Sequence, residues 1–354
     1  MNPRARTLAL IAAVACALAV GGCATRPAGA PEPPPRPEAR SVLRSIAIDR
    51  ALEDRILALN PERITADDVR TTLSAGPTPH IILLHGGVYP VHLAMRSFGR
   101  FLTGMGYPEA KIRNPGDRRW SHSPYEDSAQ LAGLVAWYYE QDGLRPMLIG
   151  HSQGGIQAIK VLRELDGQFA DRIAVWNPVS DAAEDRSSIV DPLTGNTRPV
   201  VGLSVPYVSV LGAGGAALLL PNQWNMAGHL RTVPDTVDDF TGYTIGFDLF
   251  AWTVPGMTAT SEFRHNGKAA VRNVSLPAWY NHVTAPVTQD LPEDPLVREW
   301  ISAYAPGETT SPVPLEQSGR SVLWAADVWY SVKKHWCLEA QRLVQARRAA
   351  LGGS

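Results

Sequence analysis

Residues 150–154 read Gly-His-Ser-Gln-Gly and directly follow the short apolar run 147–149. A serine between two glycines is typical of a sharp turn from a strand into a helix, because a Cβ at either flanking position would crowd the strained backbone. Residues 126–141 before the run and 155–165 after the turn both carry apolar residues at helical spacing. The sequence therefore predicts alternating strands and helices, with the Ser152 hydroxyl displayed at the end of a strand.

A second apolar run lies upstream and ends in a pair of glycines. Residues 81–84 read Ile-Ile-Leu-Leu and lead into His-Gly-Gly-Val at 85–88. In acyl transfer, two preorganised N–H donors stabilise the negative charge that develops on the former carbonyl oxygen. We expect one donor from the backbone of Gln153 and the other from Gly87 or Val88.

Together the two loops resemble those of the α/β-hydrolase family, over roughly residues 78–305. The resemblance implies an α/β fold whose mostly parallel sheet is flanked by helices, with a loop at residues 85–88 after the third strand and the serine after the fifth. The sequence departs from the family's pattern before residue 80, where no clear pair of strands precedes the first loop. The chain contains neither H-E-x-x-H nor C-x-x-C, so we expect no metal and no cofactor.

The resemblance also implies a nucleophile, an acid and a histidine in that chain order. The histidines after Ser152 are His229, His265, His282 and His335. We favour His282, because it follows residues 271–279, which read as the last strand, and a base at the end of that strand can take the proton of the serine. His122, in the loop before the serine, either lines the pocket or is a solvated histidine, and we favour the solvated histidine.

The acid should orient the histidine from a loop after one of the two strands that precede the last. Asp248 ends the β-like run 242–248 and is our first choice. Asp181 follows the apolar segment 172–176, which reads as the sixth strand, and is our second choice. Asp238 and Asp239 read as residues of a polar turn.

These residues predict a serine hydrolase that cleaves carboxylic esters, from small molecules or lipids, through an acyl-enzyme intermediate. An alternative is a non-catalytic lipoprotein that uses the same scaffold for binding in the cell envelope. A minor alternative is NAD binding, because Gly212, Gly214 and Ala217 match G-x-G-x-x-A. Pro221 follows too soon for the full helix that a dinucleotide fingerprint needs.

Residues 180–245 depart from simple alternation and read as an insertion between the sixth and seventh strands. Its apolar, glycine-rich part, residues 205–220 within 203–232, fits either a cap or lid over the serine or a buried helix or strand of the core, which periodicity cannot separate. A C-terminal helix is expected over 320–351. It either packs against the sheet and keeps a basic face outward, or lies on an anionic membrane surface.

The N-terminus reads as a targeting segment, because two arginines precede an apolar stretch of 13 residues, 8–20, which is too short to span a bilayer. Residues 1–22 resemble a lipoprotein signal peptide that is cleaved before Cys23, the expected lipidation site. The alternative is an ordinary signal peptide cleaved nearby. The proline-rich residues 23–40 predict an extended tether, followed by a helical segment over 41–76. The resemblance implies a bacterial envelope protein, lipid-anchored at the outer membrane and facing the periplasm.

Charge and cysteine content narrow the remaining classes. The formal net charge of -1, without a basic cluster in the central region, gives no basis for nucleic-acid binding. Of the three cysteines, Cys16 lies in the apolar stretch and Cys23 is the expected lipidation site, which leaves Cys337 alone in the mature chain. The expected domain therefore depends on its apolar core rather than on a disulfide.

Overall fold

The computed structural model describes residues 43, 46–88, 91–246, 248, 251, 262–308 and 321–352. Internal contacts divide the chain into residues 1–36 and 37–354, and all described residues belong to the second unit. The expected signal peptide, the lipidation site Cys23 and nearly all of the proline-rich tether fall in the first unit. These three predictions therefore lie outside the described residues.

Within the described residues, five parallel strands form a central sheet. Their spatial order is β1 (Ile81–Leu84), β2 (Met147–His151), β7 (Val205–Leu211), β9 (Val237–Ile245) and β11 (Ala270–Leu276). Strands covered on both faces bury every side chain, which explains why β1 is a continuous apolar run and why β2 and β7 are mostly apolar rather than alternating. The fold is α/β with a mostly parallel sheet, as the sequence predicted.

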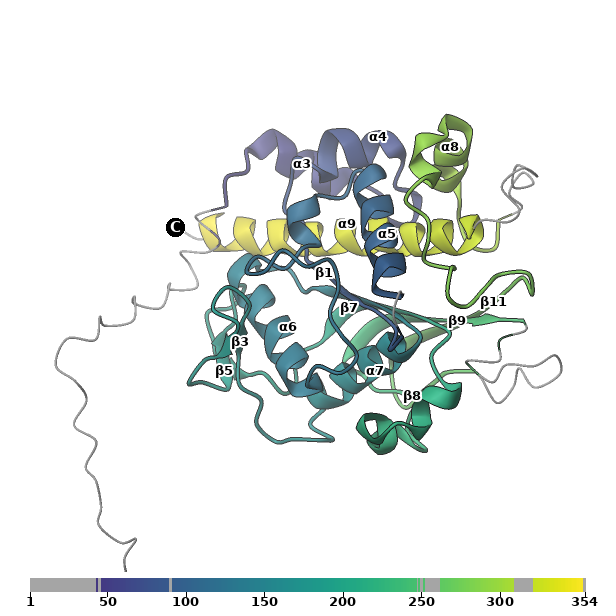
Figure 1. Ribbon diagram of the computed structural model, residues 1–354. Helices are drawn as coiled ribbons and strands as arrows, with labels where there is room; N and C mark the ends of the chain where they lie inside the picture. Colours follow the sequence, from purple (N-terminus) through teal and green to yellow (C-terminus); the bar gives the residue numbers. More distant parts are fainter. Residues whose placement is uncertain are drawn as a thin grey trace, which may run out of the picture. The chain divides into compact units, whose positions relative to one another are not determined.

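Helices cover both faces of the sheet (Figure 1). On one face lie α6 (Ser128–Asp142) and α7 (Gln153–Leu165), and on the other α5 (Val91–Gly104) and α9 (Val322–Gly352). Successive side chains of a strand point to opposite faces, so alternate residues of β1 pack in two different clusters, one against each helix layer.

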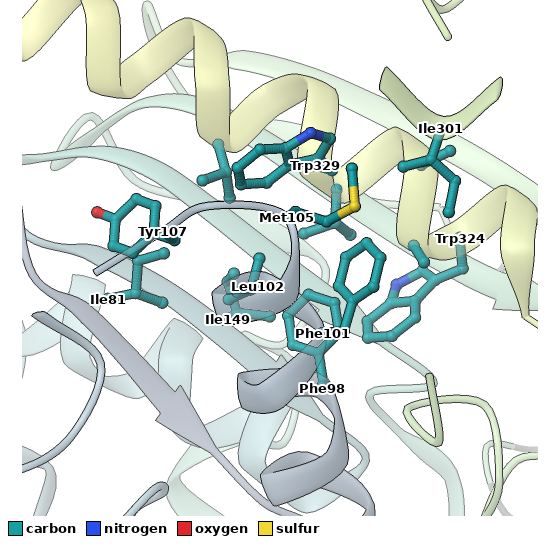
Figure 2. Packing of buried hydrophobic residues seen from close by; sticks show 14 of the residues in the cluster. Ile81, Phe98, Phe101, Leu102, Met105, Tyr107, Ile149, Ile301, Trp324 and Trp329 are labelled. Carbon is teal, nitrogen blue, oxygen red and sulfur yellow. The ribbon is translucent and has the colours of Figure 1, made fainter. Parts of the chain in front are cut away.

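The core beneath α9 is rich in aromatic rings (Figure 2). Phe98 on α5 lies between two of them: its ring centroid is 5.6 Å from that of Phe101 and 4.6 Å from that of Trp324 on α9. Full burial of one such side chain stabilises the fold by about 1.5–3 kcal/mol. This packing fixes α5, which carries one side of the candidate site.

A buried carboxylate joins α9 to the sheet. Asp327 accepts hydrogen bonds from Tyr243 on β9, from Arg272 on β11 at 3.0 Å and from Tyr304 at 3.2 Å. A buried charge is tolerated only when it is paired and hydrogen-bonded, and these partners meet that requirement. The C-terminal helix therefore lies against the sheet, as one of the two alternatives predicted.

The described N-terminal residues form short helices and turns on the same side of the molecule. Their elements are α3 (Arg50–Ala58), η1 (Pro61–Arg63), α4 (Ala66–Asp68) and η2 (Val69–Leu73). Gln341 of α9 donates to the carbonyl oxygens of Ile56 and Leu59 at 3.0 and 2.9 Å, and the buried Lys333 ammonium donates to that of Ile64 at 2.7 Å. This segment is thus attached to the C-terminal helix.

The prediction of a sixth sheet strand at residues 172–176 is wrong. Only its last residue enters a strand, β3 (Trp176–Asn177), which pairs antiparallel with β4 (Ala182–Ala183) outside the central sheet. Ile173 and Val175 are buried against the α6 and α7 side of the core, so their apolar character reflects packing of a loop rather than membership of the sheet.

The prediction of one continuous insertion over residues 180–245 is also wrong. These residues contain β7 and β9, which belong to the central sheet. A strand buried on both faces has the same apolar pattern as a buried helix, which is why the sequence left residues 205–220 undecided. Between β7 and β9, residues 212–236 leave the sheet. Before β7 lie β5 (Ser188–Val190) and β6 (Thr197–Pro199), and between β7 and β9 lie η4 (Gly215–Leu219), η5 (Pro221–Met226) and β8 (Thr232–Val233). The short strand β10 (Arg264–His265) follows β9 in the chain and pairs with β8.

Three short helices complete the described chain. They are η3 (Glu109–Lys111), η7 (Leu291–Glu293) and α8 (Pro295–Ala303). Among the described helices, none combines the length and the apolar character that crossing a membrane requires.

Candidate active site

Ser152 occupies the turn between β2 and α7 with a backbone that few serines adopt. Its φ is 56° and its ψ is -125°, a sparsely populated conformation at positive φ that costs an L-residue on the order of 1–3 kcal/mol. The surrounding sheet holds it there, because its N–H donates to the carbonyl oxygen of Leu211 at 2.7 Å. Strain of this kind persists where the structure over-determines it, and it marks Ser152 as a candidate functional residue.

The two glycines that flank the serine are sterically required. A Cβ on Gly150 would lie 2.5 Å from the carbonyl oxygen of Gly154. A Cβ on Gly154 would collide with the carbonyl groups of Leu84 and His85 at the end of β1. The turn can therefore lie close to the neighbouring loop only because both residues lack a side chain.

The side chains of Ser152, His282 and Asp248 form one hydrogen-bonded chain. The Nε2 atom of His282 lies 2.8 Å from the Oγ atom of Ser152, and its Nδ1 atom lies 2.6 Å from the Oδ2 atom of Asp248. Asp248 Oδ1 also accepts from the N–H of Ala251 at 3.1 Å. A carboxylate on Nδ1 keeps the proton on that nitrogen, so that the lone pair of Nε2 faces the hydroxyl.

Three parallel strands bring these residues together from distant parts of the sequence. Ser152 follows β2, Asp248 lies just beyond β9, and His282 lies in the loop after β11. The carboxyl ends of parallel strands meet at one edge of a sheet, and this edge buries both Asp248 and His282. Asp181, the second choice for the acid, does not lie at this edge. It is exposed in the turn between β3 and β4.

The loop expected to supply backbone donors lies against the serine. A Cβ on Gly86 would be 3.0 Å from the Cβ of Ser152, and a Cβ on Gly87 would collide with the side chain of Gln153. The carbonyl oxygen of Gly87 accepts a hydrogen bond from the Tyr125 hydroxyl at 3.1 Å. The structure thus brings Gly87 beside Gln153, while the Val88 side chain is exposed.

His151 contributes a contact that the sequence did not reveal. Its Nε2–H donates to the backbone carbonyl oxygen of His282 at 2.7 Å, across 131 positions of sequence. The ring is fully buried, and burial, together with the nearby His282, lowers the pKa of His151 to about 3. A neutral His151 therefore fixes the backbone of His282 next to the turn that carries Ser152. No local signal could identify this role, since it depends on a long-range contact.

Gly212, the first residue after β7, lies directly against the imidazole of His282. Its φ is +62°, and a Cβ would lie 2.8 Å from Cε1 of His282 and 3.4 Å from Oδ2 of Asp248. The sequence pattern suggested another role for this glycine, as the start of a dinucleotide fingerprint with Gly214 and Ala217. That fingerprint lacks its helix, because β7 leads into the five-residue 3-10 helix η4 instead.

Substituting Gly212 by alanine should displace the imidazole. It should lower the rate of a reaction in which His282 takes the proton of Ser152 by roughly 10- to 100-fold, since small misplacements of reacting groups have effects of that size. Gly202→Ala is the matched control, because Gly202 also has a positive φ, +90°, but a Cβ on it would meet no atom within 4 Å. Both variants put a Cβ at a positive φ and should lower Tm, and Gly212→Ala should lower it more because its Cβ also meets the imidazole. Equal loss of activity in both would contradict the assigned role of Gly212.

His122 is not the solvated histidine expected from the sequence. It is buried, its Nδ1 atom lies 2.8 Å from Oε2 of Glu126, and its backbone bridges to β1 in parallel orientation. Its carbonyl oxygen accepts from the N–H of His85 at 3.1 Å. His122 therefore extends the edge of the sheet and supports the loop at residues 85–88.

The remaining histidines after Ser152 do not reach the site. His229 and His265 are exposed, and His335 is buried with its Nε2 atom 3.4 Å from Oδ2 of Asp239. Across the described ranges, no group of three or more His, Cys, Asp or Glu residues is arranged to hold a metal ion.

Comparison with known proteins adds little to this geometry. No protein-family model matches the sequence, and no curated protein matches it. Among solved structures, the chain is similar to one described as "RedJ with PEG molecule bound in the active site", with 16% identity and a TM-score of 0.30 over 60% of this chain and 85% of that one. A likeness at this level carries no functional argument, so the interpretation depends on the site itself.

Proposed function

We propose that this protein is a serine hydrolase of the α/β-hydrolase type that cleaves carboxylic esters through an acyl-enzyme intermediate. The observation that carries the proposal is the hydrogen-bonded chain from Ser152 through His282 to Asp248. Two further observations support it: the strained backbone of the serine, and the glycine loop that lies against it.

In the proposed reaction, Oγ of Ser152 attacks the ester carbonyl carbon while Nε2 of His282 takes the hydroxyl proton. The tetrahedral oxyanion would accept hydrogen bonds from the N–H of Gln153 and from that of Gly87 or Val88. His282 then gives its proton to the departing alkoxide, which leaves as an alcohol. Water, deprotonated by His282, attacks the acyl-enzyme. The bond between the acyl carbon and Oγ then breaks, which releases the acid while His282 returns the proton to Ser152. Asp248 stabilises the imidazolium in both steps without accepting a proton.

Residues 212–236 are proposed as a cap beside the nucleophile. Asn222 of η5 accepts a hydrogen bond from the Gln153 side chain at 3.5 Å, and its carbonyl oxygen accepts from Nζ of Lys160 at 3.0 Å. Leu219 and Trp224 of the same segment are more than half exposed. An apolar segment attached this close to Ser152 is suited to contact the acyl or alcohol chain of an ester, from a small molecule or a lipid.

The N-terminal sequence supports a proposed location at the cell envelope. A lipid on Cys23 would anchor the domain through the proline-rich tether, at the outer membrane and facing the periplasm. This part of the proposal depends on the sequence pattern alone.

A non-catalytic envelope-binding protein is the competing proposal, and one observation favours catalysis over it. Maintaining Ser152 at a φ of 56° destabilises the fold, and binding alone gives no reason to keep that cost. A fluorophosphonate probe should label the purified domain, and a panel of para-nitrophenyl esters from acetate to laurate should report turnover. A folded domain that neither reacts with the probe nor hydrolyses any ester would refute the proposed function.

A further inference from the structure

A cavity of about 540 Å³ lies beside the glycine loop. Residues 85–88 form one wall, α5 contributes His92 and Arg96, and residues of the segment 119–125 form the third wall. Gly86 borders both the cavity and the nucleophile, since its Cβ position is 3.5 Å from Oγ of Ser152. The cavity therefore adjoins the candidate nucleophile at Gly86, a residue with no side chain to separate the two.

The lining of the cavity is positively charged. It includes Arg96 and Arg119, and none of its described lining residues is Asp or Glu. Arg119 is already balanced, because its guanidinium lies 3.2 Å from carboxylate oxygens of both Asp117 and Glu126. Arg96 is exposed, and no carboxylate in the described part of the chain forms an ion pair with it. One positive charge in the cavity therefore remains available to a ligand.

The position of Arg96 is set by rigid elements rather than by a surface loop. Arg96 lies in the middle of α5, which buries the neighbouring Met95 and Phe98 in the core. The Trp120 ring, another wall of the cavity, rests on the same helix: a Cβ on Gly99 would be 2.5 Å from its Cε3 atom. The charge is thus presented next to a fixed aromatic surface, an arrangement suited to a short chain that ends in an anion.

We propose that the preferred substrates are esters that carry an anionic group, a carboxylate or a phosphate, on the chain that enters this cavity, and that Arg96 binds that group. The inference rests on the proposed hydrolase function and names its substrate class. The planar guanidinium matches both anions through paired hydrogen bonds. Trp120 and Tyr125 provide apolar surface for the intervening chain, and the cavity has the size of ordinary small-molecule sites.

Two pairs of esters test the preference and the side of the ester that carries the charge. Para-nitrophenyl glutarate differs from para-nitrophenyl valerate in a terminal carboxylate that replaces a methyl group on the acyl chain. Meta-carboxyphenyl butyrate and meta-tolyl butyrate form the same pair on the alcohol side. We expect a higher kcat/KM for the charged member of one pair, mainly through KM, and a smaller ratio at high salt because ions screen the attraction. The same ester with a phosphonate in place of the carboxylate shows which of the two kinds of anion the protein prefers.

Arg96→Gln should lower the charged-to-neutral ratio by about tenfold, because a hydrogen bond to a charged group contributes about that factor or more to binding, and Arg96→Lys should restore part of it. Arg100→Gln is the matched control: Arg100 lies one turn further along α5, is also exposed, and does not line this cavity. Three results would each overturn the proposal. They are equal kcat/KM for charged and neutral esters, a charged-to-neutral ratio that Arg96→Gln leaves unchanged, and an equal loss of that ratio in Arg100→Gln.

Binding is measured separately in the Ser152→Ala protein, with phenyl glutarate as the titrant. Arg96→Gln in that background should weaken binding by about tenfold if the anion lies against the guanidinium. This measurement needs no turnover. A protein that hydrolyses none of the esters refutes the proposed function, and the titration still decides whether Arg96 binds the anion.

Discussion

Replacing Ser152 by alanine is expected to lower kcat/KM for a para-nitrophenyl ester by roughly 10⁴-fold or more, since loss of a nucleophile removes the whole covalent pathway. Fluorophosphonate labelling should disappear together with turnover. The fold should be retained, because alanine also has a Cβ and meets the same backbone strain at a φ of 56°. Labelling measured by intact mass, with Tm as the measure of folding, checks both expectations.

Ser180→Ala is the control for this experiment, since Ser180 is an exposed serine of the loop that joins β3 to β4. It should keep full labelling and turnover. If the Ser152→Ala protein were still labelled as strongly as the parent, Ser152 would not be the nucleophile.

Asp248→Asn is expected to lower kcat by roughly 10³- to 10⁴-fold, with a smaller change in KM. The amide of asparagine can donate to Nδ1 of His282, which lies 2.6 Å from Oδ2 of Asp248. Nδ1 would then hold a lone pair and Nε2 the proton, so His282 could not accept the proton of Ser152. Steady-state kinetics on one neutral ester, with Tm measured in parallel, checks this expectation.

Asp181→Asn serves as the matched control, because the sequence offered Asp181 as the other acid and the structure exposes it in a turn. Its activity should stay within a factor of about two of the parent, as expected for a surface change. Loss of turnover in Asp181→Asn with a fully active Asp248→Asn would reverse the assignment of the acid.

Local pattern carried enough information to predict the two strands that flank the site. The runs that became β1 and β2 are short, apolar and followed by glycines, so their ends were visible in the sequence. The local pattern did not predict the full extent of β9, because Asp239 suggested a polar turn. That aspartate lies inside the strand, with its Oδ2 3.4 Å from His335 and 3.6 Å from Lys334 of α9. Partners nearly one hundred residues away balance the charge, and no local window contains them.

The same distinction between local and distant contacts applies to the candidate site. Position after a strand, together with the chain order that the family resemblance implies, selected Ser152 and His282 and placed Asp248 ahead of Asp181. The structure brings Ser152, His282 and Asp248 into contact. The supporting contacts of His151 and Gly212 were missed, because each depends on where the loop after β11 returns to the sheet.

The attachment of α9 to the N-terminal segment determines when the fold can be completed. Gln341 and Lys333 bond to carbonyl groups that lie 269 to 285 positions earlier in the chain. Contacts of such long sequence separation form slowly, since most of the chain lies between the two partners. The docking of residues 46–76 needs the last helix of the chain, so that the first described part of the chain is among the last to reach its final place.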